Sequence, residues 1–179
     1  MLDAVIHGTV DGNLTALARR LGWHAAVFTF LGFAFGLGGL PLIATNHPLI
    51  GLAALIASRL IFAIAAHDGA GDADRKLAML LRDISLAGYP FAFAIAAPEH
   101  GAACVFLIFG LAAMISARFA YPGAGDGRFA PGGFDFAAAF LLGVLVPGWF
   151  GLLAYLLGGL CFVAAGLAID SGRAPGSGA

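Results

Sequence analysis

The chain of 179 residues is 61% apolar, only 11% charged, and carries a formal net charge of −1 at pH 7. A soluble domain usually has about a quarter of its residues charged, so this composition excludes a water-soluble fold. The near-neutral balance also argues against a nucleic-acid partner. We therefore expect a single all-α domain that is integral to a membrane.

The first predicted element covers residues 2–21 and is an amphipathic helix. Apolar side chains recur every three or four positions along it, while Asp11 and Arg19 lie off this stripe. Such a helix lies in the membrane interface, and we place it on the cytoplasmic leaflet. The stripe consists of Leu2, Ile6, Val10, Leu14, Leu17 and Leu21.

Six apolar segments follow, and we expect each of them to cross the membrane as a helix. The turn Asn46-His47-Pro48 separates the first two segments. The last apolar stretch would be about 51 Å long as one helix, against a hydrocarbon core of roughly 30 Å, so we divide it at Pro147-Gly148. The predicted spans lie near residues 23–45, 49–66, 77–97, 101–119, 133–146 and 149–169; they complete one membrane domain over 1–170, followed by a disordered tail over 171–179.

The basic residues outside the middle of the spans all fall on one side of the membrane in this arrangement. The opposite turns contain no lysine or arginine. Because cytoplasmic loops are enriched in these residues, we expect both termini in the cytoplasm and the protein in a bacterial inner membrane. The basic residues are Arg19, Arg20, Arg75, Lys76, Arg118, Arg128 and Arg173.

Three charged residues lie several positions inside the predicted spans: Arg59, Arg82 and Asp83. A charge in the membrane costs a few kcal/mol on insertion scales, so it normally has a partner or a function. Arg59 and Asp83 lie at matching depths of roughly 9–11 Å on neighbouring antiparallel helices. We therefore predict that they form a pair. A purely structural pair and a role in binding a headgroup or substrate both stay open.

Three further acids precede the third span: Asp68, Asp72 and Asp74. Their spacing loosely resembles a calcium-binding loop, but the bidentate glutamate of that pattern is absent. We interpret the segment as a solvated loop, with a divalent cation site as the alternative. Cys104 and Cys161 lie inside apolar runs, and we interpret both as buried hydrophobic residues.

Four segments along the chain have a pattern found together in one known family. They are residues 11–20, the stretch Trp23 to Thr29 followed by Leu-Gly-Phe, Ser58-Arg59-Leu60, and Arg82-Asp83-Ile84 with the nearby Tyr89-Pro90. In these segments the chain resembles the CDP-alcohol phosphatidyltransferases. The resemblance implies six transmembrane helices after an interfacial helix. It also implies transfer of a phosphatidyl group from a CDP-linked donor to an alcohol, with release of CMP.

The signature of that family is D-x-x-D-G-x-x-A-R, eight residues, and then G-x-x-x-D-x-x-x-D. Its four aspartates hold divalent metal against the CDP pyrophosphate. Aligned without gaps from Ser58-Arg59-Leu60, Asp83 falls on the third aspartate, whereas apolar residues occupy the other three acid positions. These residues are Phe62, Ala65 and Ala87, with Ala66 and Met79 in place of the glycines and Ala70 in place of the arginine.

Three hypotheses about function stay open. The leading one is a divergent or catalytically impaired relative of these transferases in phospholipid biosynthesis, with membrane lipids and a CDP-linked lipid as ligands. The second is an active enzyme in which Asp83 is catalytic and Mg²⁺ or Mn²⁺ is held by Asp83, Asp68 and Asp72. The third is a small transporter or non-catalytic partner subunit with an intramembrane Arg/Asp pair. A homodimer also stays open. The candidate headgroup-binding residues are Arg59, Arg82, Arg75 and Lys76.

Overall fold

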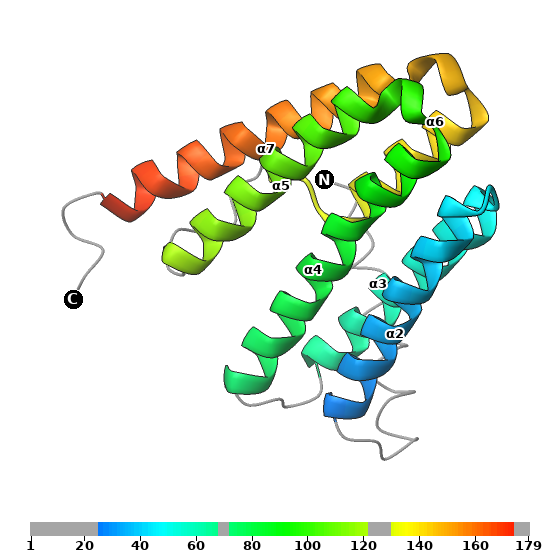
Figure 1. Ribbon diagram of the computed structural model, residues 1–179. Coiled ribbons are helices and arrows are strands. Elements are labelled where there is room, and N and C mark those ends of the chain that lie inside the picture. Colours follow the sequence, from blue (N-terminus) through cyan, green and yellow to red (C-terminus); the bar gives the residue numbers. More distant parts are fainter. Residues whose placement is uncertain (1–24, 68–71, 122–129, 174–179) are drawn as a thin grey trace.

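The computed structural model describes residues 25–67, 72–121 and 130–173, and these residues form helices joined by short turns (Figure 1). Two single-turn 3₁₀ helices, η1 and η2, lie directly before α5 and α7. The predicted interfacial helix over 2–21 lies outside the described residues. The elements are α2 (Ala25–Ala44), α3 (Pro48–His67), α4 (Asp72–Ala96), η1 (Pro98–His100), α5 (Gly101–Ala120), α6 (Gly133–Leu145), η2 (Pro147–Trp149) and α7 (Phe150–Arg173).

Five of these helices are long and apolar enough to cross a membrane: α2, α3, α4, α5 and α7. The sixth apolar helix, α6, has 13 residues and is therefore only about 20 Å long. The all-helical membrane architecture is confirmed, and each predicted span corresponds to one helix. The bounds agree closely where proline marks a turn, at Pro48, Pro98 and Pro147, because proline cannot continue the preceding helix.

The start of α4 differs from the prediction. The helix begins at Asp72 and not near residue 77, so Arg75 and Lys76 belong to its first turns and not to a loop. Acidic residues are favourable in the first turn of a helix because they complement its dipole, and Asp72 and Asp74 lie there. The charged residues at the start of α4 therefore belong to the helix, although they lie outside its apolar part.

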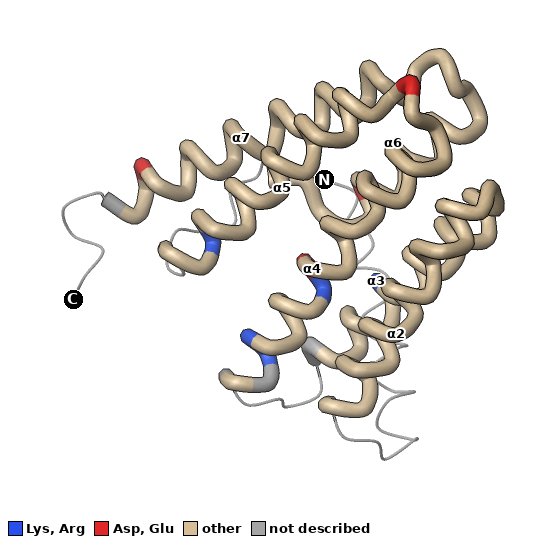
Figure 2. Tube along the Cα trace, in the orientation of Figure 1, with Lys and Arg blue, Asp and Glu red and all other residues tan. Residues whose placement is uncertain are grey.

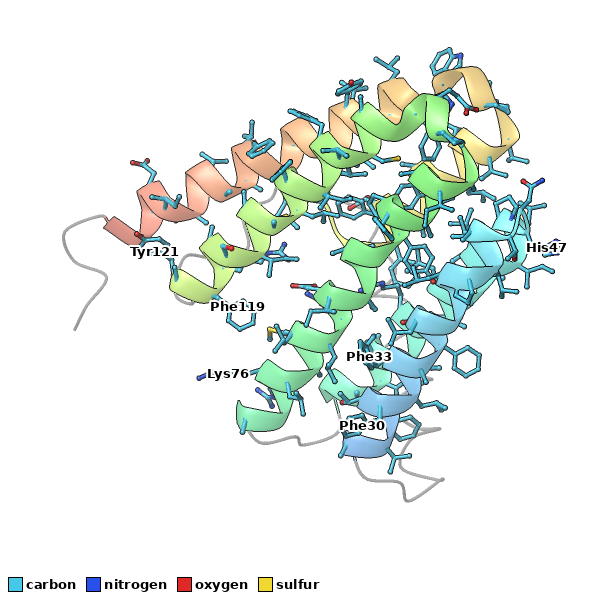
Figure 3. The ribbon with its side chains drawn as sticks, viewed as in Figure 1. Phe30, Phe33, His47, Lys76, Phe119 and Tyr121 are labelled. Carbon is cyan, nitrogen blue, oxygen red and sulfur yellow. The ribbon has the colours of Figure 1, made fainter. Side chains whose placement is uncertain are left out.

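The helices form two groups that share α4. Helix α2 packs against α3 and α4, and α5 packs against α7, while α4 also contacts α5. Figure 1 shows that the two groups meet near the η1 and η2 turns and diverge toward the opposite end. In Figure 3, Lys76 and Phe119 lie toward that diverging end, whereas His47 lies at the other end of the bundle.

Glycines bring α2 close to its two neighbours. The Ser58 hydroxyl of α3 donates a hydrogen bond to the carbonyl oxygen of Gly32 at 2.7 Å, and the Tyr89 hydroxyl of α4 donates to that of Gly36 at 3.0 Å. Glycine lets neighbouring helix backbones approach closely, because it has no side chain at the contact. At Gly36, a Cβ atom would lie 2.8 Å from the Cβ of Ser85, which leaves no room for one.

Candidate functional site

Polar side chains gather on α4 and on the parts of α3 and α5 that contact it, and we call this group the polar centre. Most of its members are buried: Arg59 is 4% exposed, Asp83 is 6% exposed, and two serines are fully buried. Figure 2 shows the basic and acidic positions next to each other on α4 and a further basic position on α5. The polar centre consists of Ser58, Arg59, Arg82, Asp83, Ser85 and Arg118.

Arg59 connects α3 to α4 and reaches α6. Its NH2 nitrogen donates to the carbonyl oxygen of Arg82 at 3.0 Å and to the Ser85 hydroxyl at 3.4 Å. The Ser85 hydroxyl in turn donates to the same carbonyl oxygen at 2.7 Å. The side-chain stem of Arg59 lies against Gly133 at the start of α6, where a Cβ atom would be only 2.5 Å from the Arg59 Cδ. This arginine therefore joins three helices.

Asp83 lies between two guanidinium groups. Its Oδ1 atom accepts a hydrogen bond from Arg82 Nε at 3.0 Å, and its Oδ2 atom lies 3.9 Å from Arg118 NH1. The Arg82 and Arg118 side chains are 37% and 26% exposed, so both are partly accessible while the carboxylate is not. The contact to Arg118 links α4 to the last turn of α5.

The predicted pair of Arg59 with Asp83 is wrong. The ion pairs of Asp83 with described residues involve Arg82 and Arg118, whereas Arg59 donates to Ser85 and the Arg82 carbonyl. Residues two positions apart on a helix point about 200° apart around its axis. Ser85 faces α3, so Asp83 points away from it toward α5. Arg59 contacts α4 on either side of Asp83 in sequence, but the Asp83 side chain points in another direction around the helix.

The residues of the aligned metal signature do not fit a divalent ion. Phe62 is buried with its ring 3.2 Å from where a Gly32 Cβ would be, and Ala65 and Ala87 offer no ligand atom. The remaining carboxylate, Asp83, is engaged by two arginines. In the part of the chain that the structure describes, no three His, Cys, Asp or Glu side chains gather to hold a metal.

The structure bears on one of the other two predicted metal ligands, and only through its backbone. Asp68 lies outside the described residues, as does the side chain of Asp72. The backbone of Asp72 opens α4 eleven positions before Asp83, which places the two about 16 Å apart along the helix axis. Ligand oxygens lie roughly 2 Å from Mg²⁺, so two short side chains this far apart on one helix cannot bind the same ion.

The predicted headgroup-binding residues divide into two levels. Arg59 and Arg82 belong to the polar centre, where Arg59 is buried and Arg82 is partly exposed. Arg75 and Lys76 are exposed near the start of α4. Arg75 lies seven positions before Arg82, so the two share a helix face about 10 Å apart. Sequence reasoning missed Arg118, which it counted among the cytoplasmic charges. Arg118 lies inside the predicted span over 101–119, and this position could have indicated a charge within the helix bundle.

The arrangement of five long apolar helices with a shorter sixth defines a multi-spanning α-helical membrane protein. The chain is 30% identical over 190 residues to "Inner membrane protein YnjF" of Escherichia coli (strain K12), with 91% of each chain covered. The protein therefore belongs to the family of this inner membrane protein. No model of a protein family matches the chain. No solved structure matches it either.

Proposed function

We propose that this protein is a divergent relative of the CDP-alcohol phosphatidyltransferases that no longer carries out metal-dependent transfer and binds phosphate groups of lipids. The observation that carries the proposal is the state of Asp83. It is the one carboxylate left in the aligned signature, and Arg82 and Arg118 engage its two oxygens.

Loss of transfer follows from the chemistry that the reaction needs. Divalent ions at a pyrophosphate neutralise its charge and orient it, and each ion generally takes one or two carboxylates besides the phosphates. At the aligned positions this chain offers one carboxylate, and a bulky phenyl ring at Phe62 fills the place of another. The residues that would hold the ions are therefore missing.

Phosphate binding is supported by the basic side chains that remain. Guanidinium groups offer a planar set of donors that matches phosphate oxygens. Arg82 uses only its Nε atom on Asp83, and its terminal nitrogens make no hydrogen bond to any described residue. Arg75 and Lys76 provide further exposed positive charge along the same helix. The alternative is a small transporter or non-catalytic partner subunit with an intramembrane Arg/Asp pair, and transport by the protein in liposomes would favour it.

The test is a transfer assay on the purified full-length protein. Labelled CDP-diacylglycerol is supplied with a panel of alcohols and with Mg²⁺ or Mn²⁺, and release of CMP is measured. We expect no release above that of Asp83→Asn. Turnover in the natural protein that disappears in Asp83→Asn would contradict the proposal. The matched control restores the signature with Phe62→Asp, Ala65→Asp, Ala66→Gly and Ala87→Asp, and gain of turnover in that variant would support a decayed enzyme.

A further inference from the structure

We infer that Arg82 and Arg118 take the place of a divalent metal at the Asp83 carboxylate and form a metal-independent site for a phosphate group. The inference rests on the proposed function and deepens it by naming the residues and the ligand chemistry. It also assigns a binding role to Arg118, which lies on a different helix from the other candidates.

The Asp83 carboxylate already has a positive charge near each of its two oxygens. Each of its oxygens faces one guanidinium group, Oδ1 at 3.0 Å from Arg82 Nε and Oδ2 at 3.9 Å from Arg118 NH1. A dication at the same oxygens would have to displace both arginines or lie beside them, and the mutual repulsion opposes this in a poorly solvated site. Asp83 therefore orients two arginines here.

The two arginines are arranged to meet an anion from outside the bundle. Asp83 is buried, while the side chains of Arg82 and Arg118 are 37% and 26% exposed, so a ligand can reach parts of both arginines more easily than the carboxylate. They come from α4 and from the last turn of α5, where the two helix groups diverge (Figure 1). An anion held there would contact both groups of helices at once.

Phosphate is the ligand class that this geometry favours. Its oxygens can accept donors from two guanidinium planes, and charge-assisted hydrogen bonds are roughly twice as strong as neutral ones. Arg75, two turns away on the same face of α4, adds attraction for an anion approaching from that end. A lipid headgroup and a free phosphate share this chemistry.

The experiment measures binding to the full-length protein in detergent with EDTA present throughout. The probes are dihexanoyl phosphatidic acid, inorganic phosphate and, as a zwitterionic control, dihexanoyl phosphatidylcholine. We expect phosphatidic acid to bind in EDTA, and Arg82→Gln and Arg118→Gln each to weaken its binding at least about tenfold. Arg173→Gln, which removes the same charge at the end of α7, is the matched control and should leave binding unchanged. Equal binding of inorganic phosphate would identify a free phosphate as the ligand, and weaker binding a lipid-borne one.

Two variants guard against loss through misfolding. Arg82→Lys and Arg118→Lys keep the positive charge but lose the planar donor set, so they should bind more tightly than the glutamine variants and more weakly than the natural protein. Asp83→Asn keeps an oxygen acceptor for Arg82 and removes a negative charge, so binding in EDTA should be unchanged or tighter. A phosphate held by a metal would instead not bind in EDTA, and its binding in Mg²⁺ would be lost in Asp83→Asn.

Binding that appears only with Mg²⁺, or that is unaffected by both glutamine variants, would overturn the inference. The proposed loss of transfer is tested separately, by CMP release, and neither of these binding results contradicts it. Conversely, CMP release with Mg²⁺ would overturn the proposed function, while binding in EDTA that depends on Arg82 and Arg118 would still support the arginine site.

Discussion

Tyr89 illustrates how single polar groups hold the helices together inside the apolar bundle. It is completely buried on α4, and its hydroxyl donates to the carbonyl oxygen of Gly36 at 3.0 Å, with that of Gly51 at 3.4 Å. These two glycines lie on α2 and α3, so one hydroxyl joins three helices. In an apolar interior without water, the Tyr89 hydroxyl has few hydrogen-bond acceptors besides these backbone carbonyls.

We expect Tyr89→Phe to lower the stability of the protein by about 0.5–1.5 kcal/mol, because the interhelical hydrogen bond is lost while the ring still packs. The measurement is the unfolding midpoint in detergent. Tyr155→Phe is the matched control, because Tyr155 is 47% exposed on α7. An equal effect of the two substitutions would show that the bond to Gly36 contributes nothing specific.

The polar centre shows which residue-level features sequence could predict. Counting residues along the spans predicted Arg59 and Asp83 at matching depths, and Arg59 does contact α4 at residues 82 and 85. The partners were missed because a shift of two positions, from Ser85 to Asp83, turns a side chain to nearly the opposite face of α4. Arg118 becomes a neighbour of Asp83 only through the packing of α5 on α4, which no local pattern encodes.

At the scale of helices, the contact of α2 with α3 and α4 depends on which glycine faces inward. Gly38 and Gly39 are adjacent in α2 but differ completely in their surroundings. A Cβ atom on Gly38 would meet nothing within 4 Å. A Cβ atom on Gly39 would collide with the Tyr89 hydroxyl and would lie 2.7 Å from the Gly51 carbonyl oxygen. Substitutions at Gly38 and Gly39 therefore distinguish the effect of helix packing from the effect of helix propensity.

We expect Gly39→Ala to destabilise the protein by about 1–3 kcal/mol, since backbone and a buried ring must move to accept the methyl group. Gly38→Ala should be neutral or slightly stabilising, because alanine favours a helix more than glycine does. Thermal unfolding of both variants in the same detergent tests the difference. If Gly38→Ala were as harmful as Gly39→Ala, the close approach of α2 to Gly51 would be in doubt.

Helix ends were predictable where sequence punctuation is local and less so elsewhere. Pro48, Pro98 and Pro147 fix the starts of helical segments by their own geometry. The start of α4 was placed too late, because a change from apolar to charged residues marks the edge of an apolar span and not the end of a helix. Asp72 to Lys76 continue α4 as a polar extension.

For the whole molecule, orientation in the membrane remains a prediction from charge. If the short α6 also crosses the membrane, six crossings place both termini on the side of Arg75, Lys76 and Arg118, and we expect this side to be the cytoplasm. Reporter fusions after Gly71, after Gly125 and at the C-terminus should all report the cytoplasm. A periplasmic signal from any one of them would contradict an even number of crossings.

The short helix α6 has a consequence for the membrane around it. At about 20 Å it does not match a hydrocarbon layer of roughly 30 Å, and such mismatch is accommodated by local thinning of the bilayer or by polar groups entering from one side. Its first residue, Gly133, lies against the Arg59 stem, so the short helix starts beside the buried arginine. We expect lipid headgroups to be drawn inward at this place, which would shorten the path from the buried Arg59 to water. The bilayer should therefore be thinner beside the polar centre than elsewhere around the protein.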